Sequence, residues 1–175
     1  MTLATQRFLN RTLPVMRSVY ELRPAERRRK PKVFERPFAD MAEVRGRLNK
    51  SEREIFAEIH SQRLRWAFNF AAGGEKVFLR VYKPALEYWV NPRRPLVGSF
   101  DELLRKLFPK ATLGVGTTES IPGTDFQDAF NLSHHNVRLL LDAGLILPRD
   151  TAWGTGTPAI LLPSVIGFLK GRQLS

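Results

Sequence analysis

Apolar residues recur along this chain with two different spacings, and each spacing predicts a different element. Between Ser51 and His60, the apolar side chains Ile55 and Ile59 fall on one face of a helix. Ser51 and Glu54 have the Ser-x-x-Glu spacing of a capping box, in which each residue satisfies a free backbone donor of the other. We therefore expect a helix that begins at Ser51.

Apolar and polar residues alternate in 64–70 and again in 76–82. Such alternation is the pattern of a half-buried strand, and Gly73 and Gly74 provide a turn between the two segments. The pattern predicts a β-hairpin. One long helix over 51–72 is the alternative.

Further signals flank this hairpin. Residues 38–48 predict a short helix, and Pro84 suits the first turn of another. The capping-box spacing recurs at the start of 99–108, which predicts a third helix, and the intervening residues 91–95 form a basic loop. We recognise no internal repeat in the sequence.

Two predicted helices follow in the last third of the chain, separated by a short turn. The first occupies 124–130, and Ser133 can cap the second, which ends at Gly144. Residues 153–157 are rich in Gly and Thr and predict a wing turn, and Pro163 begins a last helix. This is the spacing of a helix-turn-helix.

Over residues 121–172 this order resembles the winged helix-turn-helix of the excisionase and MerR type, including the Ser-x-x-x-Val core and the terminal Phe-Leu. The resemblance implies that the helix after Ser133 is a possible recognition helix. Its exposed side chains would then be His134, His135 and Arg138.

The charge around this helix departs from the family. Leu139 stands where a basic side chain is common, and residues 112–150 contain two basic residues against five acidic ones. Phosphate neutralisation supplies most of the non-specific attraction to a duplex. Two interpretations therefore stay open, a DNA-reading module and a protein-docking or structural module, and the charge favours the second.

The positive charge is confined to the rest of the chain. Residues 1–110 hold 24 Lys and Arg against 12 Asp and Glu, whereas residues 111–175 hold 4 against 5. This bias predicts an anionic partner, and we favour RNA over DNA. The candidate nucleic-acid-binding residues are Arg23, Arg27, Arg28, Arg29, Lys30, Lys32, Arg93, Arg94, Arg105 and Lys106.

Together these patterns predict an α+β fold in three parts. Residues 1–37 form a basic extended arm, because prolines interrupt any regular helix there. Residues 38–111 form a small lobe of helices and a β-hairpin, and residues 112–175 form a winged helix-turn-helix-like helical lobe that contacts neighbouring proteins.

No pattern in the sequence supports catalysis. The chain has no cysteine, and no Ser/His/Asp arrangement rises above chance, so we expect a non-enzymatic protein without a cofactor. Adjacent His134 and His135 point about 100° apart on a helix and make a poor metal chelate. No apolar run approaches the ~20 residues that a membrane span requires.

The aromatic residues of the predicted hairpin have two interpretations. They could stack on RNA bases, but core packing is the favoured one, since the chain needs them to bury a core. Arg63, Arg65 and Arg80 on the opposite face would then be free to contact a nucleic-acid backbone.

Residues 1–20 are rich in Arg and hydroxyl groups and lack acidic residues, which resembles a mitochondrial targeting segment. A basic start to a bacterial or phage protein, located in the host cytoplasm, is the alternative. In character the whole chain resembles accessory proteins of mitochondrial ribosomes, which implies an RNA-anchored subunit of a ribonucleoprotein particle. The alternatives are an excisionase-like DNA-binding transcriptional regulator and an adaptor or inhibitor that occupies another protein's nucleic-acid channel.

Overall fold

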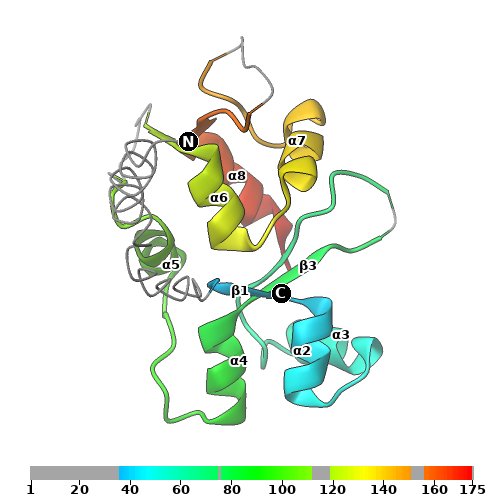
Figure 1. Ribbon diagram of the computed structural model, residues 1–175. Helices are drawn as coiled ribbons and strands as arrows, with labels where there is room; N and C mark the ends of the chain where they lie inside the picture. Colours follow the sequence, from blue (N-terminus) through cyan, green and yellow to red (C-terminus); the bar gives the residue numbers. More distant parts are fainter. Residues whose placement is uncertain (1–35, 75, 112–118, 151–155, 175) are drawn as a thin grey trace, which may run out of the picture. The chain divides into compact units, whose positions relative to one another are not determined.

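The computed structural model describes residues 36–74, 76–111, 119–150 and 156–174. These residues belong to one compact unit that begins at Arg36. Within them, seven helices accompany a four-stranded and a two-stranded antiparallel sheet, which confirms the α+β class (Figure 1). The predicted arm lies outside the described residues except for Arg36 and Pro37.

The elements follow one another in an alternating order. The strands are β1 (Phe38–Asp40), β2 (Ala67–Asn69), β3 (Leu79–Tyr82), β4 (Ser120–Ile121), β5 (Ile160–Leu161) and β6 (Gln173–Leu174). The helices are α2 (Met41–Leu48), α3 (Glu52–His60), α4 (Lys83–Val90), α5 (Phe100–Leu107), α6 (Gly123–Phe130), α7 (His134–Asp142) and α8 (Leu162–Arg172).

The capping signals placed the helices correctly. Ser51 and Glu54 form the complete capping box at the start of α3, and the Ser99 and Ser133 side chains accept backbone hydrogen bonds at the starts of α5 and α7. Pro84 lies in the first turn of α4. Each of these signals is local, which is why the sequence alone reveals it.

The predicted β-hairpin is also confirmed, and the single long helix is wrong. Strands β2 and β3 pair antiparallel, with Phe68 opposite Arg80. The expected helix over 38–48 forms only from Met41, because the preceding three residues are β1, which pairs with β3. The Asp40 side chain then caps α2.

The described residues contain an internal repeat that we did not recognise in the sequence. The order strand, helix, turn, helix, two extended segments, helix occurs in 37–90 (repeat 1) and again in 119–172 (repeat 2). In the first half of each repeat, corresponding residues are 82 positions apart, and from the strand before the last helix onward they are 79 apart, as Pro84 of α4 and Pro163 of α8 are. Helix α2 matches α6 and α3 matches α7 in length, with eight and nine residues respectively.

The two repeats share unusual backbone details. Asn49 and Asn131 both end the first helix in the left-handed conformation, with φ of 50° and 53°. Each last helix begins with a backbone hydrogen bond of 2.9 Å to the segment before the first strand, from Lys83 to Pro37 and from Leu162 to Glu119. Such agreement in both caps and tertiary contacts identifies one architecture used twice.

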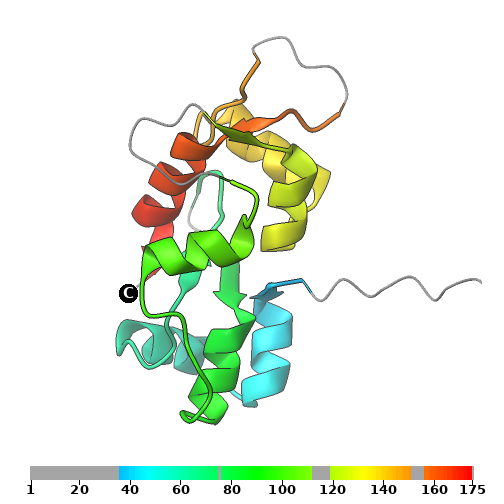
Figure 2. The same ribbon diagram turned by 90° about the vertical axis from the view of Figure 1, so that its left-hand side faces the viewer.

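The repeats share one hydrophobic core. Phe130 of repeat 2 is fully buried, and its ring centroid lies 4.9 Å from those of Phe38 and Phe70 in repeat 1. Strand β6 pairs with β2, so the C-terminal segment completes the sheet of repeat 1. Figure 2 shows α5, which belongs to neither repeat, between their two groups of helices. The boundary predicted around residue 112 thus divides a chain whose two sides pack together.

A buried carboxylate connects three parts of repeat 1. Glu58 of α3 is 4% exposed, and it accepts a hydrogen bond from Trp89 of α4 at 3.1 Å and forms ion pairs with Lys50 and Arg63 at 3.2 and 2.9 Å. Burial raises the pKa of Glu58, but the Trp89 and Lys50 hydrogen bonds and the positive charges of Arg63 and Lys50 outweigh it and lower the pKa.

We expect Glu58→Gln to lower the free energy of unfolding by about 1–2 kcal/mol at neutral pH, because the ion pairs are lost while the Trp89 hydrogen bond can remain. Since folding lowers the pKa of Glu58, its stabilisation is present above the unfolded-state pKa and is lost as the pH falls through the folded-state value. Urea unfolding at pH 7 and pH 3 tests this. The difference between wild type and variant should shrink at pH 3, and an equal difference at both values would contradict it.

Candidate nucleic-acid interface

The predicted basic residues fall into three groups in the structure. Arg23, Arg27, Arg28, Arg29, Lys30 and Lys32 lie outside the described residues. Arg93 and Arg94 lie in the loop after α4, and Arg105 and Lys106 lie in the last turn of α5. Figure 2 shows these two places at different levels of the unit, so the structure does not gather the four side chains into one cluster.

All four of these described side chains are exposed. Arg94 forms a 2.7 Å ion pair with Glu87 of α4, and Lys106 forms a 3.4 Å pair with Glu102 one turn earlier on α5. Exposed pairs of this kind are weak. The cations therefore remain able to contact phosphate groups.

The possible recognition helix presents a mixed surface. His134, His135 and Arg138 of α7 are exposed, as predicted, and Leu139 beside them is 42% exposed. The His134 Nδ1 atom lies 2.6 Å from the Thr157 hydroxyl, which also accepts a hydrogen bond from Gln127 of α6. His134 thus holds α7 to the segment that precedes β5.

The expectation that Arg80 contacts a nucleic-acid backbone is wrong. Arg80 is only 6% exposed, and its guanidinium donates to the carbonyl oxygens of Phe130 and Asn131 at 2.8–3.2 Å. It therefore binds the C-terminal end of α6, where free carbonyl groups favour a cation. Alternation along β3 predicted an outward side chain, but repeat 2 covers that face of the sheet.

The aromatic side chains of the hairpin pack in the core, as the favoured interpretation held. Trp66, Phe68, Phe70 and Tyr82 are at most 6% exposed, and Phe78 is half-buried beneath the Arg80 guanidinium. Base stacking on these four buried rings would require the core to open. Arg63 and Arg65 are exposed, although Arg63 pairs with Glu58.

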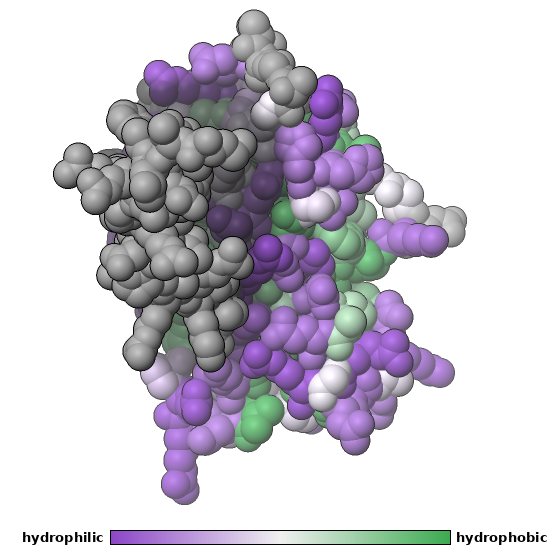
Figure 3. Space-filling model, in the orientation of Figure 1, coloured by the Kyte–Doolittle hydropathy of each residue, from purple (hydrophilic) through white to green (hydrophobic). Residues whose placement is uncertain are grey.

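Sequence reasoning missed several exposed arginines of repeat 1. Arg45 and Arg47 lie on α2, and Arg53 lies on α3. Figure 3 shows mainly hydrophilic side chains over α2 and α4, in the lower half of the view. These residues are scattered singly along the chain, so no run of like charge marks them. The Asn-x-Ser spacing recurs in the turn between α2 and α3 and in the turn between α6 and α7. It is the one signal that could have located the helices that carry these arginines.

The described residues also bear on two other kinds of site. Among them, no group of three or more His, Asp or Glu side chains is placed to hold a metal ion. None of the helices in the described ranges is long and apolar enough to cross a membrane.

Comparisons with protein-family models, curated proteins and solved structures find no match for this chain. Its function is therefore inferred from the charges and contacts described above.

Proposed function

We propose that this chain is a non-enzymatic nucleic-acid-binding protein that acts as an RNA-anchored structural subunit of a ribonucleoprotein particle, such as a mitochondrial ribosome. The arm over 1–37, the loop after α4 with Arg93 and Arg94, and the last turn of α5 with Arg105 and Lys106 contact the RNA backbone. Repeat 2 contacts neighbouring proteins. The protein positions itself on RNA without reading a sequence.

The placement of charge relative to the turn-linked helices supports this proposal. In a helix-turn-helix, the second helix presents its N-terminal residues to base edges. In repeat 1 that helix begins with Glu52 and Glu54, and in repeat 2 it carries the exposed Leu139 and Asp142. Each second helix carries a single exposed arginine, Arg53 or Arg138. Arg93, Arg94 and Arg105 lie instead on a loop and on α5, where they suit backbone contacts, which position a protein but carry no sequence information.

The duplicated architecture favours a second candidate, an excisionase-like DNA-binding regulator. Each repeat contains two helices joined by a short turn, α2 with α3 and α6 with α7. Two such units in one chain could occupy two successive duplex sites, as a dimer does. In this case His135 and Arg138 on α7 would contact base edges.

A set of binding titrations separates the two candidates. We expect the triple variant Arg93→Ala/Arg105→Ala/Lys106→Ala to weaken binding to single-stranded and structured RNA. It should also reduce the salt slope by about 0.7 for each single-strand phosphate group that the variant no longer neutralises. The double variant His135→Ala/Arg138→Ala should bind as wild type does. Affinity is measured by fluorescence anisotropy on the full chain at several salt concentrations.

The opposite pattern would contradict the RNA proposal. If wild type prefers one duplex DNA sequence and the α7 variant loses about 1–3 kcal/mol of that preference, the regulator is the correct function. No binding to any RNA at low salt would also overturn the structural-subunit proposal.

A further inference from the structure

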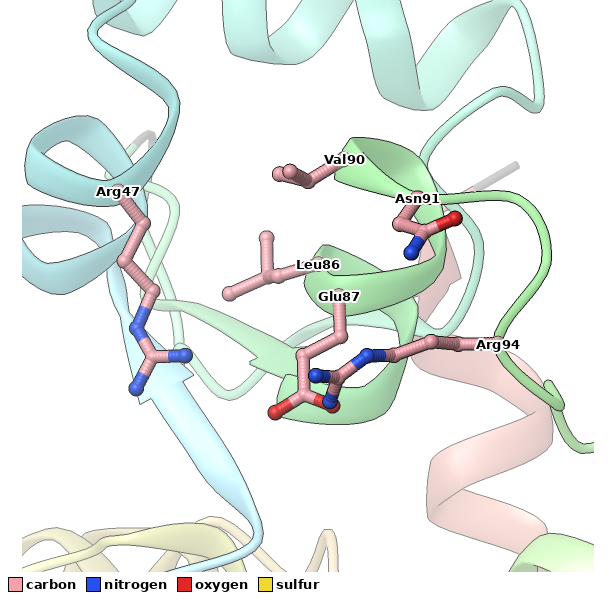
Figure 4. Close-up of a pocket in the computed structure, with 6 residues that line it drawn as sticks. All are labelled: Arg47, Leu86, Glu87, Val90, Asn91 and Arg94. Atoms are coloured by element: carbon pink, nitrogen blue, oxygen red, sulfur yellow. The ribbon is translucent and has the colours of Figure 1, made fainter.

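Helices α2 and α4 enclose an open groove on the surface of repeat 1. We call it the α2–α4 groove; it has a volume of about 490 Å³ and is lined by Arg47, Leu86, Glu87, Val90, Asn91 and Arg94. In Figure 4, Leu86 and Val90 point from α4 toward α2, and Arg47 extends from α2 on the other side. The groove therefore combines an apolar centre with arginines at two edges.

The internal repeat shows that this face is used differently in the two halves of the chain. Arg47 corresponds to Ala129 of α6, and Leu86 and Val90 correspond to Val165 and Leu169 of α8. All three counterparts in repeat 2 are at most 6% exposed. Arg47 and Val90 are exposed in repeat 1, whereas Leu86 is buried like its counterpart, so two of the three positions on this face are open in repeat 1 and buried in repeat 2.

The open face is not suited to a second copy of the chain. Repeat 2 docks through Arg80, which binds the end of α6, but the residue of repeat 2 that corresponds to Arg80 is Ala159. A further copy could not repeat this contact at the end of α2. Arg47 stands where repeat 2 has Ala129, and its charged side chain makes the α2–α4 face too polar to pack against another chain as α6 and α8 pack within the unit.

The two arginines give the groove the chemistry of a phosphate site. The Arg47 and Arg94 side chains are 39% and 59% exposed, and each pairs with one carboxylate, Glu43 and Glu87 respectively. Glu43 is shared with Lys83 at 3.1 Å. The groove lining itself holds two arginines and one carboxylate, Glu87, and counting Lys83 and Glu43 outside the lining also leaves one net positive charge. Guanidinium groups match phosphate oxygens in a bidentate geometry.

The apolar centre favours a single strand over a duplex. Val90 is 65% exposed, more than any other large apolar side chain among the described residues, and Leu86 is buried beneath the groove. An unpaired base can place its face on such an apolar surface while its phosphates reach the flanking cations. In a duplex the base faces are covered by their neighbours.

We propose that the α2–α4 groove binds a nucleotide of single-stranded RNA, with the base on the exposed Val90 and the flanking phosphates at Arg47 and Arg94. This inference rests on the proposed function and deepens it. It assigns the unpaired part of the RNA to repeat 1. It also gives a reason for an exposed apolar side chain at Val90, because that side chain would contact the base.

Two double variants with the same change of charge test this assignment. Arg47→Ala/Arg94→Ala removes the groove cations, and Arg45→Ala/Arg53→Ala removes two exposed cations on α2 and α3 that do not line the groove. The probe is a twelve-nucleotide oligouridylate, titrated by anisotropy against the full chain. We expect the groove variant to bind about tenfold more weakly and to lower the salt slope by about 1.4, while the matched control stays within about twofold.

A third variant tests the apolar contact. Val90→Asp should weaken oligouridylate binding and abolish photocrosslinking of 4-thiouridine to α4, and urea unfolding should show that each variant keeps wild-type stability. Equal losses in the two double variants, or undiminished crosslinking by Val90→Asp, would overturn the groove while leaving RNA binding intact. If wild type binds no RNA at all, the proposed function itself fails.

Discussion

Replacing Arg80 by Leu is expected to lower the free energy of unfolding by about 3 kcal/mol, because buried carbonyl groups lose charged donors. The Arg80 guanidinium donates to Phe130 and Asn131 in repeat 2 and to Leu79 in its own strand. Leucine fills part of the space but offers no donor. Equilibrium urea unfolding of the full chain, followed by circular dichroism, measures the loss.

The environment of Arg80 explains why the effect is large. Burial lowers the pKa of Arg80 more than the nearby Asp40 carboxylate raises it, but an arginine stays protonated in the folded and in the unfolded protein. Its charge is therefore balanced by the carbonyl groups at the end of α6 rather than by a directly bonded carboxylate. Two of the three carbonyl groups that accept from Arg80, those of Phe130 and Asn131, belong to repeat 2. Arg80→Leu therefore weakens the contact between the repeats as well as the fold of repeat 1.

Two further variants serve as controls. Arg80→Lys keeps the charge but cannot reproduce the planar fork, so we expect a loss smaller than that of Arg80→Leu. Arg65→Leu changes an exposed residue of the neighbouring segment and should stay within about 0.5 kcal/mol of wild type. If Arg80→Leu were as stable as wild type, Arg80 would not be the link between the repeats.

The sequence predicted elements wherever the signal is local. Ser51, Ser99 and Ser133 each cap a helix through a residue three positions later, and β2 and β3 pair across a short loop. These features depend on neighbouring residues, so they can be recognised without the rest of the fold. Strand β6 is different, since two residues at the end of the described chain become a strand only because β2 is available.

The internal repeat escaped the sequence analysis for a physical reason. What the repeats share is a set of backbone conformations and buried apolar positions, and several side chains can satisfy each of them. Val44 corresponds to Phe126 and Leu64 to Ile146, and all four are fully buried. Where a residue of repeat 1 faces solvent and its counterpart in repeat 2 faces the core, the two residues differ in charge, as Arg47 and Ala129 do.

The same reason limited the prediction of the candidate site. Charge runs identified Arg93 with Arg94 and Arg105 with Lys106. Arg47 belongs to no such run, and Arg94, which lines the same groove, lies 47 positions later in the sequence. Only the packing of α2 beside α4 places them around one groove. Conversely, Arg80 looks exposed in the alternating pattern of β3 and is buried by a segment distant in sequence.

Replacing Gly123 by Ala is expected to destabilise the fold by about 3 kcal/mol, at the upper end of the range for overpacked sites. Gly123 begins α6, and a Cβ atom there would overlap the Thr157 side chain and the carbonyl oxygen of Pro158. The obstacle includes backbone, so a change of rotamer cannot remove it. In repeat 1 the corresponding residue is Met41, which shows that the architecture itself does not require glycine.

The segment around Thr157 has little freedom to move away. Its hydroxyl contacts Gln127 of α6 and His134 of α7, so a displacement would break contacts with both helices. Gly167 provides a matched control, because it lies within α8 and an added Cβ would meet no atom within 4 Å beyond its chain neighbours and the backbone of its own helix. We expect Gly167→Ala to stabilise the helix by about 0.5–1 kcal/mol, the opposite sign for the same substitution. Thermal unfolding of both variants tests this contrast, and a neutral Gly123→Ala would show that the segment before β5 is not held against α6.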